Sequence, residues 1–228
     1  MSMKFTYYGH SCFLIETNGT KFLFDPFITG NELANGIVDV NKVEADYIFV
    51  SHGHGDHVAD LISIATRTGA MVLGAYEIIS WAQKHGVKNA RPLNFGSVNL
   101  DFGKLHFVPA AHSSCLPDGT YGGNPGGFFI KGKEGNFYYS GDTSLTMEMQ
   151  LIPRYGSLDF AVLPIGGNFT MDPEDAVMAA EMINCKKIIG VHFDTFGYIK
   201  IDHEAAKKLF KDAGKELILP VIGETISL

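Results

Sequence analysis

The residues best suited to chemistry lie in one short string, SHGHGDH, which begins at Ser51. Four potential metal ligands occur within six residues: His52, His54, Asp56 and His57. Neutral imidazole nitrogens suit zinc, iron or manganese, and a carboxylate compensates part of the charge of the metal. Gly53 and Gly55 separate these side chains and permit a tight loop that turns them toward one point. The string therefore predicts a metal site, whereas a single histidine would indicate only a polar loop.

Further candidate ligands stand at the ends of apolar segments elsewhere in the chain. His112 ends KLHFVPAAH, Asp142 ends NFYYSGD, and His192 ends KKIIGVH. Asp25 ends the segment KFLFD in the same way. Short apolar runs of this kind are typical of buried strands. We therefore expect these side chains at the carboxyl ends of strands, along one rim that is lined with ligands.

The pattern of elements predicts the architecture that holds this rim. Apolar and aromatic strands dominate the first quarter of the chain and return over residues 89–142. Helices are expected over residues 58–68 and 76–85, and two more begin after the N-caps Asp172 and Asp202. Strands alternate with helices in the last third. Together they predict an α/β fold, a four-layer αββα sandwich of two mixed β-sheets packed face to face with helices outside.

Length and composition limit the function. The chain has 228 residues, at about 100–200 residues per domain, and lacks a linker-like segment, so we expect one domain over residues 1–228. Hydrophobic residues make up 46% and charged residues 19%, which excludes a disordered chain. The net charge is −7 and no basic run occurs, so a nucleic-acid partner is not expected. The expected partner is a small-molecule substrate.

The sequence also indicates a compartment. No apolar run approaches the ~20 residues of a membrane helix. The opening MSMKFTYYGHS lacks the apolar segment of a signal peptide. Cys12, Cys115 and Cys185 are not closely spaced, which is typical of reduced thiols rather than of a disulfide framework. We therefore expect a cytoplasmic protein without a membrane span, and a homo-oligomer remains open.

The string HGHGDH, followed by single histidine and aspartate residues at strand ends, resembles the signature H-x-H-x-D-H of the metallo-β-lactamase superfamily. The resemblance covers nearly the whole chain. The segments YYGHSCFLIETNGTKFLFDPF, AAHSS, GGNPGGFFI and SGDTS resemble a narrower group within it, the bacterial and archaeal metal-dependent hydrolases. Such a resemblance predicts the fold and the metal ligands well, but it is a poor predictor of the substrate.

The resemblance implies two divalent metal ions per chain, zinc first, with manganese or iron as alternatives. The implied ligands are His52, His54 and His112 for one ion, Asp56, His57 and His192 for the other, and Asp142 as a bridge between the two. It further implies a hydrolase in which a hydroxide shared by the metals attacks an ester-type bond of a lactone, a phosphodiester or a related small substrate. Asp25 matches the early aspartate that orients the ligand loops of the family, and an ordinary strand-end turn is an equally good account of it.

The residues expected to be catalytic are Asp56, which is also an implied ligand, and His10. His10 lies in YGHSC, between the first two strands, where it could stabilise developing charge or protonate a leaving group. A structural hydrogen bond is the alternative role for this histidine. Residues 113–127 follow the ligand His112 and are rich in glycine, so they form either a substrate loop or a plain connection. Among the other histidines, His106 is expected inside a strand as a packed side chain.

Two other functions remain open on the same fold. Flavin-linked di-iron oxidoreductases share it, but they typically carry glutamate in place of the second histidine of the string and add a flavodoxin-like domain. This chain has His54 at that position and no room for a second domain. The other alternative is a non-catalytic module that binds a metal or a ligand, and the complete set of implied ligands favours an enzyme instead.

Overall fold

The computed structural model describes residues 3–228, which form two compact units. Unit 1 comprises the chain up to Asn94 together with Ser113–Pro125 and Val221–Leu228. Unit 2 comprises Phe95–His112 and Gly126–Pro220. Each unit contains one seven-stranded sheet with both antiparallel and parallel strands. The prediction of a single domain stays a prediction.

The sheet of unit 1 has the strand order β14-β1-β2-β3-β4-β5-β6. Neighbours from β14 to β3 are antiparallel, and neighbours from β3 to β6 are parallel. The strands are β1 (Lys4–Gly9), β2 (Cys12–Thr17), β3 (Thr20–Phe24), β4 (Tyr47–Phe49), β5 (Met71–Ala75), β6 (Ala90–Leu93) and β14 (Thr225–Ser227).

Four phenylalanines stack across this sheet and join its antiparallel half to its parallel half. Phe5, Phe13, Phe24 and Phe49 are fully buried, one on each of β1 to β4. The ring centroids lie 5.0 Å apart for Phe5 and Phe13, 4.6 Å for Phe13 and Phe24, and 4.8 Å for Phe24 and Phe49. Aromatic cross-strand pairs of this kind stabilise a sheet and fix its register, since a one-residue slip would turn each ring to the other face.

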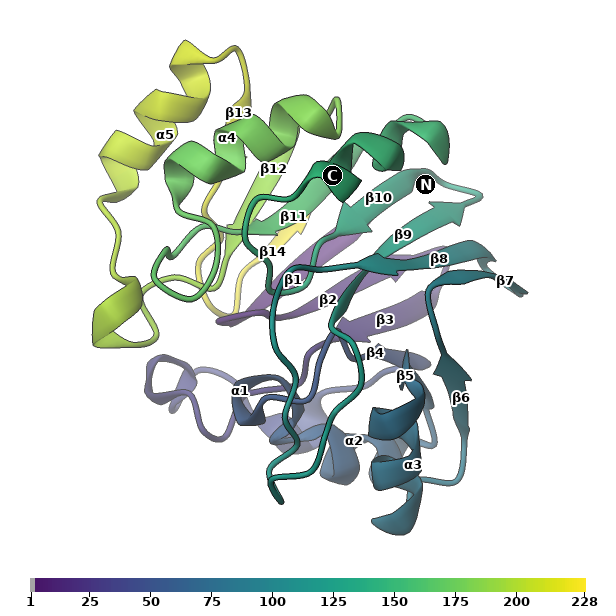
Figure 1. Ribbon diagram of the computed structural model, residues 1–228. Helices are drawn as coiled ribbons and strands as arrows, with labels where there is room; N and C mark the ends of the chain where they lie inside the picture. Colours follow the sequence, from purple (N-terminus) through teal and green to yellow (C-terminus); the bar gives the residue numbers. More distant parts are fainter. Residues whose placement is uncertain (1–2) are drawn as a thin grey trace. The chain divides into compact units, whose positions relative to one another are not determined.

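Three α-helices belong to unit 1: α1 (Gly55–Val58), α2 (Leu61–Thr68) and α3 (Tyr76–Lys84). Two short 3₁₀ turns, η1 (Glu32–Ala34) and η2 (Val40–Lys42), precede β4. Figure 1 shows α2 and α3 beside the β4, β5 and β6 end of this sheet. The sequence predicts one helix over 58–68, whereas α2 begins at Leu61 and α1 is separate. The break falls at Asp60, whose carboxylate accepts hydrogen bonds from the backbone of Ile28 and Thr29.

The sheet of unit 2 has the strand order β13-β12-β11-β10-β9-β8-β7. Neighbours from β13 to β10 are parallel, and neighbours from β10 to β7 are antiparallel. The strands are β7 (Gly96–Leu100), β8 (Gly103–Pro109), β9 (Gly126–Gly132), β10 (Asn136–Tyr139), β11 (Phe160–Pro164), β12 (Lys187–Val191) and β13 (Glu216–Ile218).

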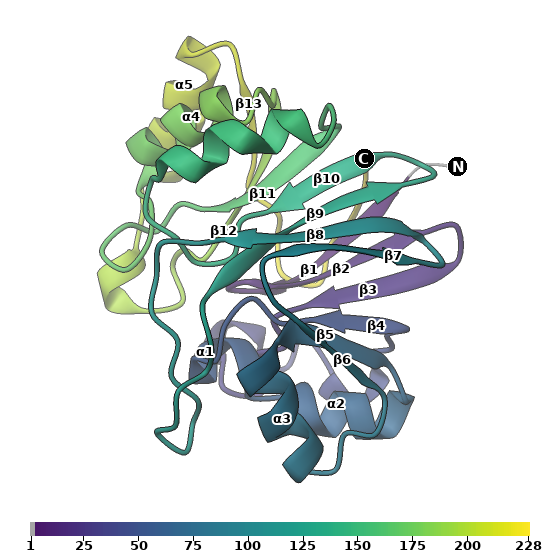
Figure 2. The ribbon, with the colours of Figure 1, turned by 45° about the vertical axis from the view of Figure 1, so that its right-hand side comes forward.

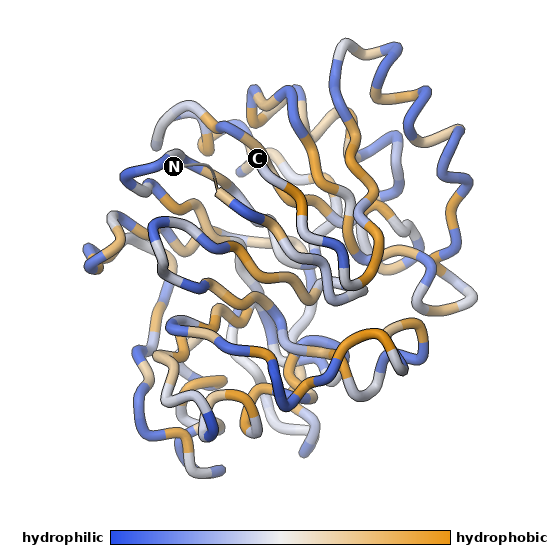
Figure 3. The backbone as a smooth tube through the Cα atoms, turned by 180° about the vertical axis from the view of Figure 1, so that it is seen from behind, coloured by the Kyte–Doolittle hydropathy of each residue, from blue (hydrophilic) through white to orange (hydrophobic). Residues whose placement is uncertain are grey.

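Helices α4 (Pro173–Met182) and α5 (His203–Asp212) lie over one face of this sheet, as Figure 2 shows. Both predicted N-caps are confirmed, because Asp172 accepts a hydrogen bond from the backbone of Asp175 and Asp202 accepts one from that of Glu204. Ala176, Ala179 and Ala180 form a buried face of α4, and the trace of α5 alternates between hydrophilic and hydrophobic residues in Figure 3. The caps therefore set where each helix begins, and the apolar stripe sets which side meets the sheet.

Several elements have no clear sequence signal. Strand β6 contains Pro92 and β14 has only three residues, so neither shows an alternating apolar pattern. Strand β13 ends at Ile218, two residues before Pro220, although the apolar run continues beyond it. Two further 3₁₀ segments, η3 (Met147–Arg154) and η4 (Gly197–Ile199), were not anticipated. Between residues 3 and 228, no helix is both long enough and apolar enough to cross a membrane.

Candidate metal centre

Strand direction brings the candidate residues of unit 1 to one edge of its sheet. Strand β1 is antiparallel to β2, β2 is antiparallel to β3, and β3 is parallel to β4. The strands β1, β3 and β4 therefore run in one direction, and their carboxyl ends share an edge. His10 follows β1, Asp25 follows β3, and the string from Ser51 follows β4. Topology thus places His10 at the same edge as the string SHGHGDH.

Asp25 organises this edge through three hydrogen bonds. Its carboxylate is fully buried and accepts bonds from the Ser51 amide at 2.7 Å and the Ser51 hydroxyl at 2.6 Å. It also accepts a bond from Nδ1 of His57 at 2.9 Å. A carboxylate on one ring nitrogen fixes the tautomer and the orientation of a ligating histidine, and it directs the other nitrogen at the metal. The contacts of Asp25 therefore fix the positions of Ser51 and of the His57 ring.

Ser51 passes this orientation on to the first two histidines of the string. Its hydroxyl oxygen lies 2.9 Å from Nδ1 of His52, and Nε2 of His52 lies 2.9 Å from Nδ1 of His54. The far nitrogen of His54, Nε2, lies 3.3 Å from the hydroxyl of Ser113. Since the Ser51 hydroxyl donates to Asp25, it accepts from Nδ1–H of His52. His52 therefore presents Nε2 and His54 presents Nδ1 to the same place.

A second group lies around the short helix α1. Oδ2 of Asp56 lies 3.1 Å from Nε2 of His10 and 3.9 Å from Nε2 of His57. One ligand atom from each of these three residues lies within 4.8 Å of the others. His10 is 1% exposed, and its ring meets those of Phe27 and His57 edge to face. His10 therefore contacts the Asp56 carboxylate from the protein interior.

The backbone is unusual at two of these positions. His10 has φ 56° and Asp25 has φ 39°, both in the left-handed region. Gly9, which precedes His10, has φ 103°, and a Cβ there would lie 2.4 Å from Nδ2 of Asn31. Non-glycine residues with positive φ cost energy and gather at functional sites. The turn after β1 therefore accepts strain in order to direct the His10 side chain at Asp56.

Residues 113–125 of unit 1 pack on the ligand loop. The Gly53 amide donates to the Ser114 hydroxyl at 3.0 Å, and a Cβ on Gly53 would lie 3.2 Å from the side chain of Leu116. A Cβ on Gly122 would lie 2.4 Å from the Ser114 hydroxyl, so this segment is closely folded. The predicted loop therefore has a structural part in holding His52 and His54.

Unit 2 gathers its three candidate residues in the same way. Strands β8, β10 and β12 run in one direction, and their carboxyl ends precede His112, Asp142 and His192. Oδ2 of Asp142 lies 2.9 Å from Nε2 of His192 and 3.8 Å from Nε2 of His112. The side chains of Asp142 and His192 are 2% and 3% exposed. The carboxylate of Asp142 thus stands between the two imidazoles.

His192 is held by a close backbone approach. It has φ 55°, and its carbonyl oxygen would lie 2.1 Å from a Cβ placed on Gly166. Only glycine fits at position 166, since any side chain would displace the His192 backbone. Asp194, two residues further, also has a positive φ of 62°.

The donors in both units fit a divalent transition metal. The donors are imidazole nitrogens and two carboxylates. Hydrogen bonds to the opposite ring nitrogens orient His52 and His57. Asp56 is half-buried and Asp142 is almost fully buried. Imidazole and carboxylate ligands suit zinc, iron and manganese. Buried carboxylates beside histidines also supply the charge that such an ion requires.

The remaining candidate residues lie apart from this chemistry. Burial raises the pKa of the Cys12 thiol far above its usual range, so the thiol stays protonated. His106 is half-buried on β8 and stacks on Tyr155 with ring centroids 4.2 Å apart, as expected for a packed side chain. Desolvation lowers the pKa of His106, with a further contribution from the Lys104 charge.

Sequence reasoning missed the hydroxyl groups that orient the histidines. Ser51 opens the string and Ser113 follows His112 directly, so both stand inside segments that already carry ligands. A hydroxyl next to a candidate ligand is a weak signal by itself, because serine is common in loops. The contacts of Ser51 with Asp25 and His52 only become visible in the structure.

Comparison with known proteins shows the family of this chain. A model of the beta-lactamase superfamily domain matches residues 4–192. A UPF0173 metal-dependent hydrolase of Flavobacterium johnsoniae is 54% identical over 227 residues, which cover 99% of this chain and 100% of the relative. A protein of the same name from Thermus thermophilus is 43% identical and covers 92% of both chains.

A solved structure agrees as well. Igni18, described as a novel metallo hydrolase from the archaeon Ignicoccus hospitalis, matches with a TM-score of 0.90 at 32% identity, over 100% of this chain and 99% of that one. With two mixed seven-stranded sheets and their helices, this likeness confirms the predicted αββα fold class. The chain belongs to the metallo-β-lactamase superfamily, in the group of the UPF0173 metal-dependent hydrolases.

Proposed function

We propose that this chain is a hydrolase of ester-type bonds with a dinuclear metal centre. The proposed substrate is a small lactone, phosphodiester or related molecule. The proposed ligands are His52, His54 and His112 for one ion, Asp56, His57 and His192 for the other, and Asp142 as the bridge. Zinc is the proposed metal, with manganese and iron as alternatives.

The observation that carries the proposal is the hydrogen-bonded chain from Asp25. Through Ser51 it orients His52, and directly it orients His57, so that both rings are held from the side away from the proposed metals. Polar groups buried this deeply cost stability unless they are hydrogen-bonded, and Asp25 is held by three such bonds. An orienting carboxylate behind histidine ligands is a regular feature of metal sites.

The contacts of Asp142 support its role as the bridge. Its carboxylate lies between two histidines that the family assigns to different ions, at 3.8 Å from His112 and 2.9 Å from His192. A carboxylate has two oxygens and can bind two ions at once. Asp142 is therefore the residue of unit 2 whose loss should affect both ions.

Metal ions in such a site lower the pKa of a water molecule and withdraw charge from the attacked bond. The residues of the chain supply position and proton transfer. His10 donates from Nε2 to Asp56 at 3.1 Å, and this bond holds the Asp56 carboxylate toward His57. We propose that Asp56 is catalytic as well as a ligand, and that His10 acts on the reaction through Asp56.

A hydrolysis screen tests the proposal. Purified protein is reconstituted with zinc, manganese or iron and assayed on a lactone, a thioester, a phosphodiester and a phosphomonoester. We expect turnover of at least one ester-type substrate, abolished by chelation and by His54→Ala, which removes a proposed ligand. The Lys84→Ala variant, altered at the end of α3, serves as a matched control with unchanged turnover. Metal-loaded, folded protein that hydrolyses none of these substrates would contradict the proposal.

Several further expectations stay predictions beside this proposal. They are the organisation of residues 1–228 as a single domain and the cytoplasmic location, and a homo-oligomer stays open as before.

A further inference from the structure

Two aromatic side chains of unit 2 stand together at the protein surface. Phe169 is 51% exposed and Tyr198 is 79% exposed, and their ring centroids lie 6.4 Å apart at an interplanar angle of 77°. Phe196, two residues before Tyr198 in the sequence, is 37% exposed. Single exposed apolar side chains are common on protein surfaces. Exposed apolar side chains that lie together instead indicate a site for a ligand or a partner. We call Phe169 and Tyr198 the aromatic pair.

The loop that carries Phe169 lies against the backbone at two of the three proposed ligands of unit 2, Asp142 and His192. It is closed by a hydrogen bond from the Gly167 amide to the Met171 carbonyl at 2.9 Å. The Met171 amide in turn donates to the carbonyl of Thr143, the residue after Asp142, at 3.0 Å. At its start, Gly166 packs on the His192 carbonyl so closely that a Cβ would not fit. Phe169 is therefore positioned by the backbone around Asp142 and His192.

The loop that carries Tyr198 leaves His192 directly and is held rigidly by Asp194. The Asp194 amide donates to the Ile199 carbonyl at 2.8 Å, and Oδ1 accepts from the Ile201 amide at 3.1 Å. Oδ2 lies 2.6 Å from Nε2 of His203 at the start of α5. One carboxylate thus closes the loop across its base. Tyr198 is presented on an ordered turn, at little entropic cost for binding.

The aromatic pair stands on two uncharged segments, the second of which is flanked by Asp194 and Lys200. Residues 166–171 read GGNFTM and residues 195–199 read TFGYI, without a charged side chain. Aromatic rings held in this way bind alkyl and aryl groups by contact area rather than by ion pairing. The chemistry of the pair therefore favours an apolar ligand group.

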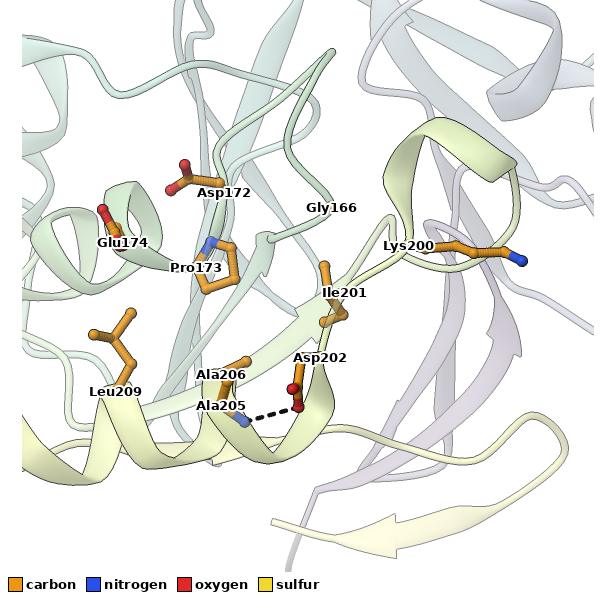
Figure 4. Close-up of a pocket in the computed structure, with 10 residues that line it drawn as sticks. All are labelled: Gly166, Asp172, Pro173, Glu174, Lys200, Ile201, Asp202, Ala205, Ala206 and Leu209. Atoms are coloured by element: carbon orange, nitrogen blue, oxygen red, sulfur yellow. Dashed lines mark hydrogen bonds between the residues drawn. The ribbon is translucent and has the colours of Figure 1, made fainter.

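A cavity also lies close to these two loops, but it is a weaker candidate than the aromatic pair for binding an apolar ligand group. It has a volume of about 410 Å³ and lies between Gly166, the start of α4 and the start of α5. Figure 4 shows the loop after Gly166 beside the turn that ends at Lys200, with Asp202 bonded to the backbone of Ala205. Its aspartates Asp172 and Asp202 are helix caps. These two carboxylates thus serve the helices rather than a ligand.

We propose that the aromatic pair binds an alkyl or aryl group of the substrate, several carbons long, while the bond to be hydrolysed lies at Asp142 and His192. This inference deepens the proposed function and rests on it, since it names the part of the substrate that lies outside the metal centre. The substrate class is then an ester-type molecule with an extended apolar arm. A small hydrophilic ester would not use the pair.

Two measurements on the full chain test the inference. The first compares kcat/KM for γ-valerolactone and γ-decalactone, which share a ring and differ in alkyl length. The second compares the affinities for octanoate and acetate by calorimetry, which does not depend on turnover. The variants are Phe169→Ala, Tyr198→Ala, and Tyr198→Phe, which keeps the ring. The control is Leu151→Ala, which removes a 55% exposed apolar side chain from η3 of the same unit.

We expect each methylene that meets the pair to raise kcat/KM by about twofold to fourfold. Octanoate should bind about tenfold more tightly than acetate if several methylenes are covered. Phe169→Ala and Tyr198→Ala should remove most of both preferences, while Tyr198→Phe and Leu151→Ala keep them.

Failure of this inference and failure of the proposed function give different results. If no lactone is hydrolysed but octanoate binding depends on Tyr198, the pair still binds an apolar group and the hydrolytic proposal on lactones fails. Turnover of both lactones at equal kcat/KM, with equal affinities for octanoate and acetate, would overturn the inference alone. A change of oligomeric state in Tyr198→Ala with both preferences intact would also overturn it, because the pair would then be a protein interface.

Discussion

At the scale of single residues, the site depends on which atom of each side chain is already occupied. His57 gives Nδ1 to Asp25, and His54 has Nε2 beside Ser113, so the two rings present different nitrogens to the site. The motif H-x-H-x-D-H specifies residue types but not these choices. They follow from hydrogen bonds to residues outside the string, which fix the tautomer of each ring.

His10 gives the sharpest residue-scale prediction. His10→Ala removes the donor 3.1 Å from the Asp56 carboxylate, and we expect kcat to fall by about 10²-fold or more. Metal content should change little, since His10 is not a proposed ligand. His10→Gln keeps a donor and should recover part of kcat. Metal analysis, melting temperature and kcat are measured on each variant. A normal kcat with a lowered melting temperature would make His10 purely structural.

The cysteines provide a second residue-scale prediction. Cys12 is fully buried with a raised pKa, so it is not available as a nucleophile. We expect Cys12→Ser and Cys115→Ser to keep most of the activity measured per folded molecule. His54→Ala should abolish activity through loss of metal. If either cysteine variant lost activity with its metal content and its fold intact, covalent thiol chemistry would replace the proposed mechanism.

At the scale of elements, alternate strands explain why residues far apart in sequence meet. In unit 1, β1, β3 and β4 point the same way, so the residues after them lie at one edge. The stack of Phe5, Phe13, Phe24 and Phe49 fixes the register of these strands. A shift of one residue would move Asp25 away from both Ser51 and His57.

Asp25 joins the end of β3 to the loop after β4 and to α1, and it carries the element-scale prediction. Asp25→Asn preserves shape but removes the charge that orients two histidines. We expect a loss of metal affinity of about 10-fold to 100-fold, measured by competition with a chromogenic chelator.

Asp46→Asn is the matched control. Asp46 also accepts a backbone bond in unit 1, from the Lys21 amide at 2.8 Å, but it does not contact a histidine of the string. Its metal affinity should stay at the level of the unchanged protein. Equal affinity in Asp25→Asn and Asp46→Asn would show that Asp25 serves only the strand-end turn.

At the scale of the whole molecule, neither unit carries the full set of proposed ligands. Unit 1 supplies four of them and unit 2 supplies His112, Asp142 and His192. The family model spans residues 4–192 and so includes segments of both units. The proposed ligands are thus spread along most of the chain, from His52 to His192.

The whole-molecule prediction is the number of ions. Reconstituted protein should saturate at two metal ions per chain, measured by elemental analysis after removal of free metal. Asp142→Ala removes the proposed bridge and should lower this number. Saturation at one ion per chain, with the same metal content in Asp142→Ala, would contradict the dinuclear proposal.

The sequence by itself determined the parts of this protein that depend on near neighbours. The ligand string, the strands before Asp25, His112, Asp142 and His192, and the caps of α4 and α5 are all local patterns. These patterns can be recognised in the sequence because each depends on residues that are only a few positions apart: ligand spacing, apolar periodicity and helix caps. The same locality explains the misses, since β6 and β14 are stabilised by neighbouring strands rather than by their own sequences.

Only the tertiary structure decided which of these residues touch. The bond between His10 and Asp56 spans 46 residues, and that between Asp25 and His57 spans 32. The contact between Phe169 and Tyr198 likewise joins two separate loops. These contacts depend on strand order, strand direction and backbone turns with positive φ. Those features arise only when the whole sheet packs. A buried polar group needs a hydrogen-bond partner, but that partner can come from any part of the chain, so the local sequence does not identify it.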